Sequence, residues 1–188
     1  MTRIVSFILS VFILSSSFGY IGNDKIDPKN FDHTLYEKVL LLKINAYRKE
    51  KGIRPLMSNS IIYKVAADQN TFLKTEKEIT HDQPTAGKKN VRERLVSYIN
   101  VKNYSVAENI ARTYVLISTQ NYLRSGSTQK SIATTYDEAA IYMLNAWIAS
   151  EFHNKNLLNP DYQLSGIASY FNPQNYSLTA VQVFATIK

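Results

Sequence analysis

The chain has 188 residues, with 22 basic and 15 acidic side chains and no cysteine. This length allows one domain with a substantial core, and a 45% apolar fraction excludes a wholly disordered chain. Disulfides are excluded, so burial of apolar side chains must stabilise the fold. The net charge of +7 favours an anionic cell envelope as a neighbour, and no basic-aromatic module indicates a nucleic-acid partner.

The first 19 residues follow the order of a secretory signal peptide. Arg3 is the only charge, residues 4–14 are almost wholly apolar, and the small residues Ser17 and Gly19 suit the positions before a cleavage site. The run is too short for a comfortable membrane span, and no later stretch is long enough for one. We therefore predict cleavage near Gly19, a secreted or periplasmic location and no membrane span after cleavage. An uncleaved N-terminal anchor is the alternative.

The polar residues 20–33 are expected to form a leader to a single domain, residues 34–188. Thr34 followed by Glu37 predicts a capping box at a helix start, and Gly52 predicts the end of that helix.

The middle of the chain predicts shorter elements. A second helix is expected from residue 59 or 60 to about Glu78, and a short helix at residues 91–98. Residues 114–117 read as a strand, and the rest of the segment up to residue 134 reads as an exposed loop.

The last third predicts a long helix and a β-hairpin. Thr135 with Glu138 forms a second capping box, and the helix leads into the only tryptophan, Trp147. Two β-rich runs, 165–171 and 176–187, are separated by turn residues, which indicates a hairpin. Helices first and a terminal hairpin last favour an α+β fold over a parallel sheet.

Three polar positions are candidates for a functional site. His81 follows the expected end of the second helix, where the helix dipole would favour a charged imidazole. Glu108 lies in an expected tight loop between small and apolar neighbours, where a carboxylate is seldom buried without a partner. Ser150, His153 and Asn156 stand three apart and share a face if their segment is helical. For an isolated histidine in such a segment, a hydrogen bond to a neighbour in the core is the commoner role. Asn45, Arg48 and Gly52, taken alone, read as surface and cap residues.

The candidate residues and several short motifs around them also occur in a characteristic order along the chain. The chain contains Asn45-Ala46-Tyr47-Arg48 with Gly52 and Pro55-Leu56, His81, Ala107-Glu108-Asn109-Ile110-Ala111, Trp147-x-x-Ser150-x-x-His153-x-x-Asn156-Leu157-Leu158, Gly166-Ile167-Ala168 and Val181-Gln182-Val183-Phe184. Over residues 35–187 the chain resembles the CAP superfamily (cysteine-rich secretory proteins, antigen 5 and pathogenesis-related proteins), in its short, cysteine-free bacterial branch. The resemblance implies a three-layer α-β-α sandwich with a mostly antiparallel central sheet. It also implies a surface cavity lined by two histidines and acidic residues.

The resemblance matches His81, Glu108 and His153 to three cavity positions, and Ser150 to a fourth where many eukaryotic members carry Glu. Two neutral imidazoles suit Zn²⁺ or another divalent cation, and Glu108 would either complete the site or orient one imidazole. Similar family members have been linked to lipid, sterol and metal binding and to envelope remodelling. We therefore expect a monomeric binding module for a small or lipid-like ligand or an envelope component. The segment from residue 112 to 134 is longer than in the short bacterial pattern.

A hydrolase, in which a Glu-His pair activates water, is the alternative function. The sequence has no Gly-x-Ser-x-Gly elbow, no His-Glu-x-x-His motif and no cysteine. Ser150 as a nucleophile activated by His153 would have a crowded geometry within one helix. A polar cluster with only a structural role is the third possibility.

Overall fold

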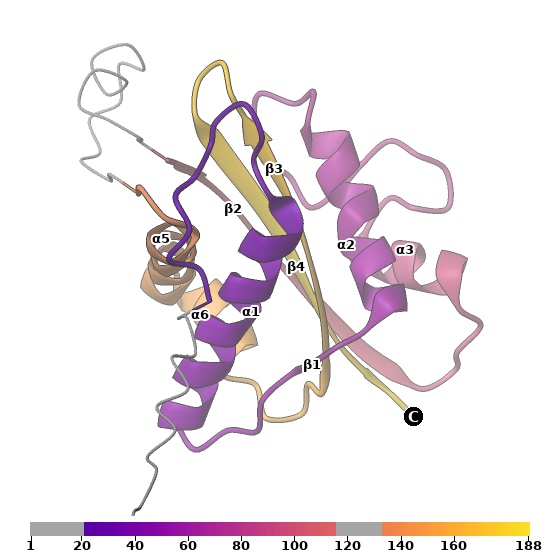
Figure 1. Ribbon diagram of the computed structural model, residues 1–188. Helices are drawn as coiled ribbons and strands as arrows, with labels where there is room; N and C mark the ends of the chain where they lie inside the picture. The colour runs from indigo at the N-terminus through magenta and orange to yellow at the C-terminus, as the bar shows by residue number, and fades with distance from the viewer. Residues whose placement is uncertain (1–20, 116–132) are drawn as a thin grey trace, which may run out of the picture.

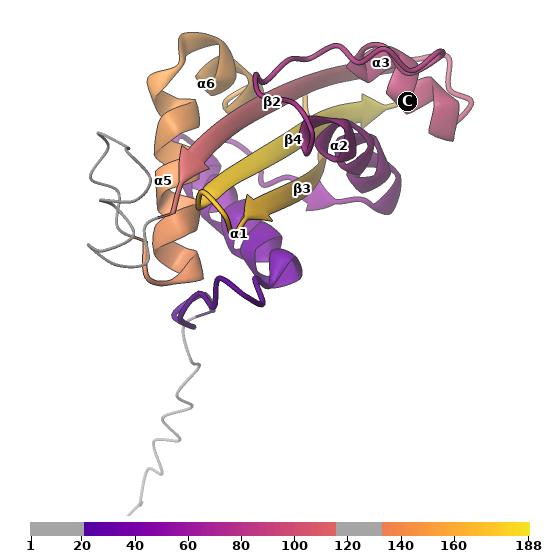
Figure 2. The same ribbon diagram turned by 90° about the horizontal axis from the view of Figure 1, so that it is seen from above.

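A computed structural model describes residues 21–115 and 133–188. Helices cover both faces of one sheet, which gives three layers (Figure 1). One face carries the helices α1 (His33–Glu50), α5 (Tyr136–Ala149) and α6 (Glu151–Leu157), and the other carries α2 (Ser60–Leu73) and α3 (Val91–Tyr98) (Figure 2). The predicted signal peptide and most of the long loop before residue 134 lie outside the described residues.

The sheet is mostly antiparallel. Its strands are β1 (Met57–Ser58), β2 (Tyr104–Tyr114), β3 (Leu164–Asn172) and β4 (Ser177–Ile187). The order is β1-β3-β4-β2, and only the short β1–β3 pair is parallel. The α+β class, the three layers and the mostly antiparallel sheet are therefore confirmed, and the terminal hairpin is β3–β4.

The strand β2 lies where the sequence predicted a loop. It pairs with β4 over its whole length, from Tyr104 opposite Ile187 to Tyr114 opposite Ser177. The prediction of a tight loop around Glu108 was wrong. Of the strand predicted at 114–117, Tyr114 is the last residue of β2, and residues 116 and 117 lie outside the described residues. Glu108 and Asn109 are both buried, so polar and apolar side chains do not alternate along β2 as they do in a strand with one wet face.

Two helix boundaries also differ from the sequence prediction. The N-cap of α1 is Asp32, whose Oδ1 accepts the Leu35 N–H at 2.9 Å, so the predicted box of Thr34 with Glu37 was wrong. An aspartate at this position is an equally good cap, and it frees Glu37 for other contacts. The helix α2 ends at Leu73, earlier than the predicted Glu78.

Other helix signals were correct. Gly52 follows α1 with a φ of +73°, a conformation that favours glycine. The box of Thr135 with Glu138 caps α5, and Asn90 caps α3. Local hydrogen bonds of this kind are set by neighbouring residues, which is why the sequence reveals them.

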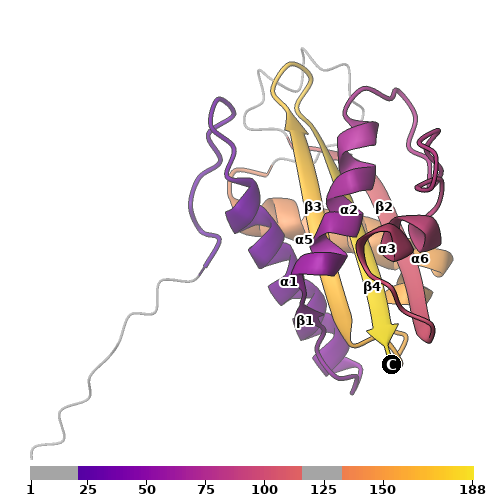
Figure 3. The same ribbon diagram turned by 90° about the vertical axis from the view of Figure 1, so that its right-hand side faces the viewer.

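The core has two halves, one on each face of the sheet (Figure 3). Trp147 of α5 is completely buried in the half beneath α1. In the other half α2 packs directly on β3, since a β-carbon at Gly166 would overlap the main chain of Ile62 and Tyr63. This close approach explains the glycine in the middle of a strand.

Arg48 was interpreted as a surface or cap residue, and this was wrong. Its guanidinium is completely buried and donates to the main-chain carbonyls of Arg54, Leu157, Asn159 and Tyr162. The fixed array of guanidinium N–H groups satisfies several carbonyls at once, so Arg48 holds the end of α1 against the α6–β3 connection.

Candidate functional site

A buried carboxylate on β2 organises the candidate site. Glu108 is 6% exposed; its Oε2 accepts from Arg94 at 2.6 Å, and its Oε1 lies 2.9 Å from His81 Nδ1. Arg94 is completely buried and also donates to the carbonyls of His81, Lys88 and Lys89. Both oxygens of Glu108 are therefore engaged, as a buried carboxylate requires.

Arg94 is the residue that sequence reasoning missed. It was not among the candidate residues, but α3 packs against β2 and turns Arg94 inward. Arg92, two positions earlier, is exposed. No local signal separates the two arginines, because only the packing of α3 decides which one is buried.

His81 depends on Glu108 and not on a helix end. The helix α2 ends at Leu73, so the predicted interaction of His81 with the end of that helix was wrong. Its side chain is 57% exposed. The Glu108 carboxylate can only accept, so Nδ1 carries the proton and Nε2 of the neutral ring keeps a free lone pair.

His153 reaches the site from the other face of the sheet. Its main-chain carbonyl accepts from Asn109 at 3.0 Å, and Asn156 donates to Asn109 Oδ1 at 2.8 Å, which ties α6 to β2. Burial, and then the charge of His81, lower the pKa of His153 below its usual 6.5. Since β2 is an edge strand and Glu108 and Asn109 point to opposite faces, His81 and His153 contact this strand from opposite sides of the sheet.

Ser150 has a different position from the other three candidates. It ends α5 and caps α6, accepting the His153 N–H at 3.5 Å. The segment from Trp147 to Leu158 is thus two helices with a break at Ser150, not one helix with Ser150, His153 and Asn156 on a common face. The structure brings His81 and Glu108 into direct contact, ties the main chain of His153 to β2 through Asn109, and gives the Ser150 hydroxyl a capping role.

The donor set limits any metal site. Among residues 21–115 and 133–188, no three His, Asp or Glu side chains are arranged to hold a metal ion. Both oxygens of Glu108 are engaged by His81 and Arg94. The atoms of these three residues that remain for binding a metal are therefore His81 Nε2 and the ring nitrogens of His153. Two imidazoles suit Zn²⁺ or Cu²⁺ in a weak site completed by water, with Glu108 orienting His81 from behind.

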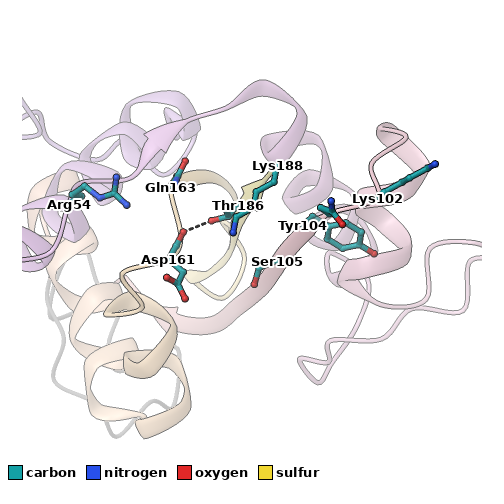
Figure 4. A pocket seen from close by; sticks show the side chains of 9 residues that line it. Arg54, Lys102, Tyr104, Ser105, Asp161, Gln163, Thr186 and Lys188 are labelled. Carbon is teal, nitrogen blue, oxygen red and sulfur yellow. Dashed lines mark hydrogen bonds between the residues drawn. The ribbon is translucent and has the colours of Figure 1, made fainter.

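A separate pocket of about 580 Å³ lies where β2 begins and β4 ends (Figure 4). Arg54, Lys102, Asp161 and Lys188 are among its lining residues, and the Thr186 hydroxyl donates to the Asp161 carbonyl. None of the four candidate residues lines it. Its charged side chains are exposed on the surface, so the buried polar network at Glu108 is the stronger candidate for a site.

A protein-family model matches the part of the chain that contains these residues. The model of the CAP family, the cysteine-rich secretory protein family, matches residues 41–184. The chain belongs to this family. The match contains α2, α3, the strands β1 to β3, most of β4 and all four candidate residues. The CAP resemblance is therefore confirmed, and the absence of cysteine agrees with the bacterial branch.

Individual relatives of this CAP domain are distant. The uncharacterized protein YkwD of Bacillus subtilis is 24% identical over 132 residues, which cover 70% of this chain and 41% of YkwD. The chain thus spans about two fifths of the length of that relative. No helix in the described parts of the chain is long and apolar enough to cross a bilayer.

Solved structures show the same fold. An outer surface protein of Borrelia burgdorferi matches with a TM-score of 0.61 and 20% identity, over 88% of this chain and 99% of that one. An extracellular protein containing an SCP domain, from Bacillus anthracis, matches with a TM-score of 0.57 and 20% identity, over 81% of this chain and 40% of that one. At such identities the likeness establishes the fold alone.

Proposed function

We propose that this CAP-domain protein is exported and acts as a binding module at the cell envelope or outside the cell. The His81–His153 pair would hold a divalent cation such as Zn²⁺, beside which a small or lipid-like ligand binds. One observation carries the proposal: Glu108, itself held by Arg94, bonds Nδ1 of His81 and leaves Nε2 free. In support, the pKa of His153 is lowered by burial and then by the charge of His81. The apolar residues 4–14, and the descriptions of two similar structures as outer surface and extracellular proteins, support export.

Each residue has a distinct task in this site. Arg94 pairs with the Glu108 carboxylate inside the protein, and Glu108 accepts the hydrogen bond from Nδ1 of His81. Asn109 and Asn156 fix α6, and with it His153, against β2. A bound divalent cation would supply a Lewis acid and open coordination positions for an oxygen of the ligand.

The hydrolase alternative needs a carboxylate that is free to take a proton from water. Both oxygens of Glu108 are engaged, and the hydroxyl of Ser150 caps a helix, so neither residue is placed as a base or a nucleophile. For this reason we do not extend the proposal to catalysis. Metal-dependent turnover of an ester, peptide or glycan, lost in Glu108→Gln, would reverse that choice.

Zn²⁺ is expected to raise the melting temperature of the mature protein, because only the folded state brings the two histidines together. At a free Zn²⁺ concentration 100 times the Kd, the added stability would be about 2.7 kcal/mol. The double variant His81→Ala/His153→Ala should lose the effect, and Glu108→Gln should weaken it less. Binding through His153 should fall only below pH 6.5, because its lowered pKa keeps the ring neutral to a lower pH. Thermal melts and calorimetry with Zn²⁺ and a chelator measure all of these.

His33, the remaining histidine of the chain, provides the matched control. His33→Ala should leave the Zn²⁺ effect unchanged, since His33 bonds to Ser169 on β3, away from β2. An unchanged melting temperature of the wild type with Zn²⁺, together with a large loss of stability in the double variant, would mean that the histidines are structural.

The export part of the proposal has its own test. Material collected outside the cytoplasm should have the intact mass of a chain that begins near Tyr20, because the residues before it have the pattern of a cleaved signal peptide. A mass that retains Met1–Gly19 would show that the segment is an anchor or is not processed.

A further inference from the structure

A second site lies at the opposite edge of the sheet from the histidines. A pocket of about 330 Å³ opens between α1, α2 and β3. Its walls include Leu41 of α1, Tyr63 of α2 and Ile167 of β3, and it also contains Glu37. β1 pairs with only the first two residues of β3, and α1 and α2 flank the rest of this edge (Figure 2).

Glu37 is held in place with one oxygen left free. Its Oε1 accepts both the N–H of Ser169 at 2.8 Å and the Ser169 hydroxyl at 2.9 Å. His33 Nδ1 lies 2.9 Å from the same hydroxyl, which fixes its orientation. Within the described residues Oε2 accepts no hydrogen bond and the carboxylate has no ion pair. A positioned carboxylate with a free oxygen in an apolar pocket is a recognition group for a cation.

The charges around Glu37 agree with this interpretation. Burial raises the pKa of Glu37 to about 7 against the opposing hydrogen bonds from Ser169, and the nearby Asp32 raises it further. The Glu37 charge is in turn the main cause of the raised pKa of Tyr63. Lys38, the one cation among the described residues that line the pocket, is exposed, and solvent screens its charge. A cation next to Oε2 would therefore stabilise the ionised form of Glu37.

We propose that this pocket binds the lysine side chain of another polypeptide, with its ammonium group on Glu37 Oε2. The aliphatic stem of lysine suits the wall formed by Leu41 and Ile167, and the ring of Tyr63 favours a nearby cation. A carboxylate or phosphate would be repelled by Glu37, and an uncharged chain would leave the carboxylate without a partner. This site shares no residue with the His81–His153 pair and is independent of it.

Titration with Nα-acetyl-lysine N-methylamide tests the proposal directly. The main-chain amide of Ser169 donates to Glu37, so its NMR signal should shift on binding and return a Kd. The matched norleucine compound, which has the stem without the ammonium group, should bind at least about tenfold more weakly.

The affinity should also depend on pH in a defined direction. Only ionised Glu37 pairs with the ammonium group, and its pKa in the free protein is about 7. At pH 6 most Glu37 carboxyl groups carry a proton, which must be released before the ammonium group can bind. At pH 8 the carboxylate is already ionised, so the affinity should be about tenfold higher than at pH 6. The ionisable groups around Glu37 are Asp32, His33, Lys38 and Tyr63, and the same wild-type protein, with all of them, is used at pH 6 and at pH 8. An affinity independent of pH, or equal for the norleucine compound, would overturn the proposal.

The variant Glu37→Gln separates charge from structure. Glutamine keeps an oxygen that can accept from Ser169, but it has no charge, so binding should weaken at least about tenfold and its pH dependence should disappear. Glu50→Gln, at the exposed end of α1 with Lys51 as its partner, is the control and should bind as the wild type does. Unchanged binding in Glu37→Gln would contradict the proposal. If that variant does not fold, the head-group and pH comparisons on the wild type decide the question.

Discussion

Trp147→Ala is expected to lower the free energy of unfolding by about 3–5 kcal/mol. The indole is completely buried and packs with Met143 and Leu144 of the same helix in the core half beneath α1. Its Nε1 has no hydrogen-bond partner among the described residues, so the loss comes from packing and from the cavity that remains. Chemical denaturation of the wild type and the variant measures it.

Phe152→Ala is the matched control for this prediction. Phe152 is an aromatic residue of the next helix, α6, and is 81% exposed, so its truncation should change stability by no more than about 0.5 kcal/mol. A shift below about 1 kcal/mol for Trp147→Ala would show that the indole does not fill the core as described.

Arg94→Met is expected to cost about 3–5 kcal/mol, because it leaves the buried Glu108 without its strongest partner. Methionine fills much of the same volume, so the loss reports on the ion pair more than on packing. Adding Glu108→Leu should restore part of the stability, since the double variant no longer buries an uncompensated carboxylate. Denaturant unfolding of both single variants and the double variant gives the interaction energy.

Arg92→Met tests whether the loss of stability in Arg94→Met comes from the buried position of that arginine and not from the removal of any arginine from α3. Arg92 lies on the same helix but is exposed, and its replacement should be close to neutral. Equal losses for the two arginine variants would mean that α3 depends on its overall charge. A double variant less stable than Arg94→Met alone would show that Glu108 is stabilised without the arginine.

Local patterns predicted a large part of the fold. The box of Thr135 with Glu138, the glycine after α1 and the turn between β3 and β4 depend on residues within a few positions of one another. The apolar face of α5 predicted a buried Trp147 because the helical period puts its members on one side. The order and spacing of the short motifs between Asn45 and Phe184 indicated the CAP family.

Predictions failed where the chain depends on distant partners. β2 is a strand because β4 pairs with it along its whole length, and its buried Glu108 and Asn109 hide the alternation that would reveal it. One local feature was also missed: the His153 N–H donates to the Ser150 hydroxyl, which caps a new helix where the polar face reads as one continuous helix.

The sequence by itself determined the family and the α+β class, and it proposed His81, Glu108 and His153 as a site, because residue types and short spacings carry that information. Only the tertiary structure decided what surrounds them. It turned Arg94 inward and left Arg92 in solvent, and it engaged both oxygens of Glu108 so that the carboxylate orients His81. It also placed Glu37 of α1 on Ser169 of β3, far along the chain. Buried polar groups must find partners, and packing, not sequence distance, decides which partners are within reach.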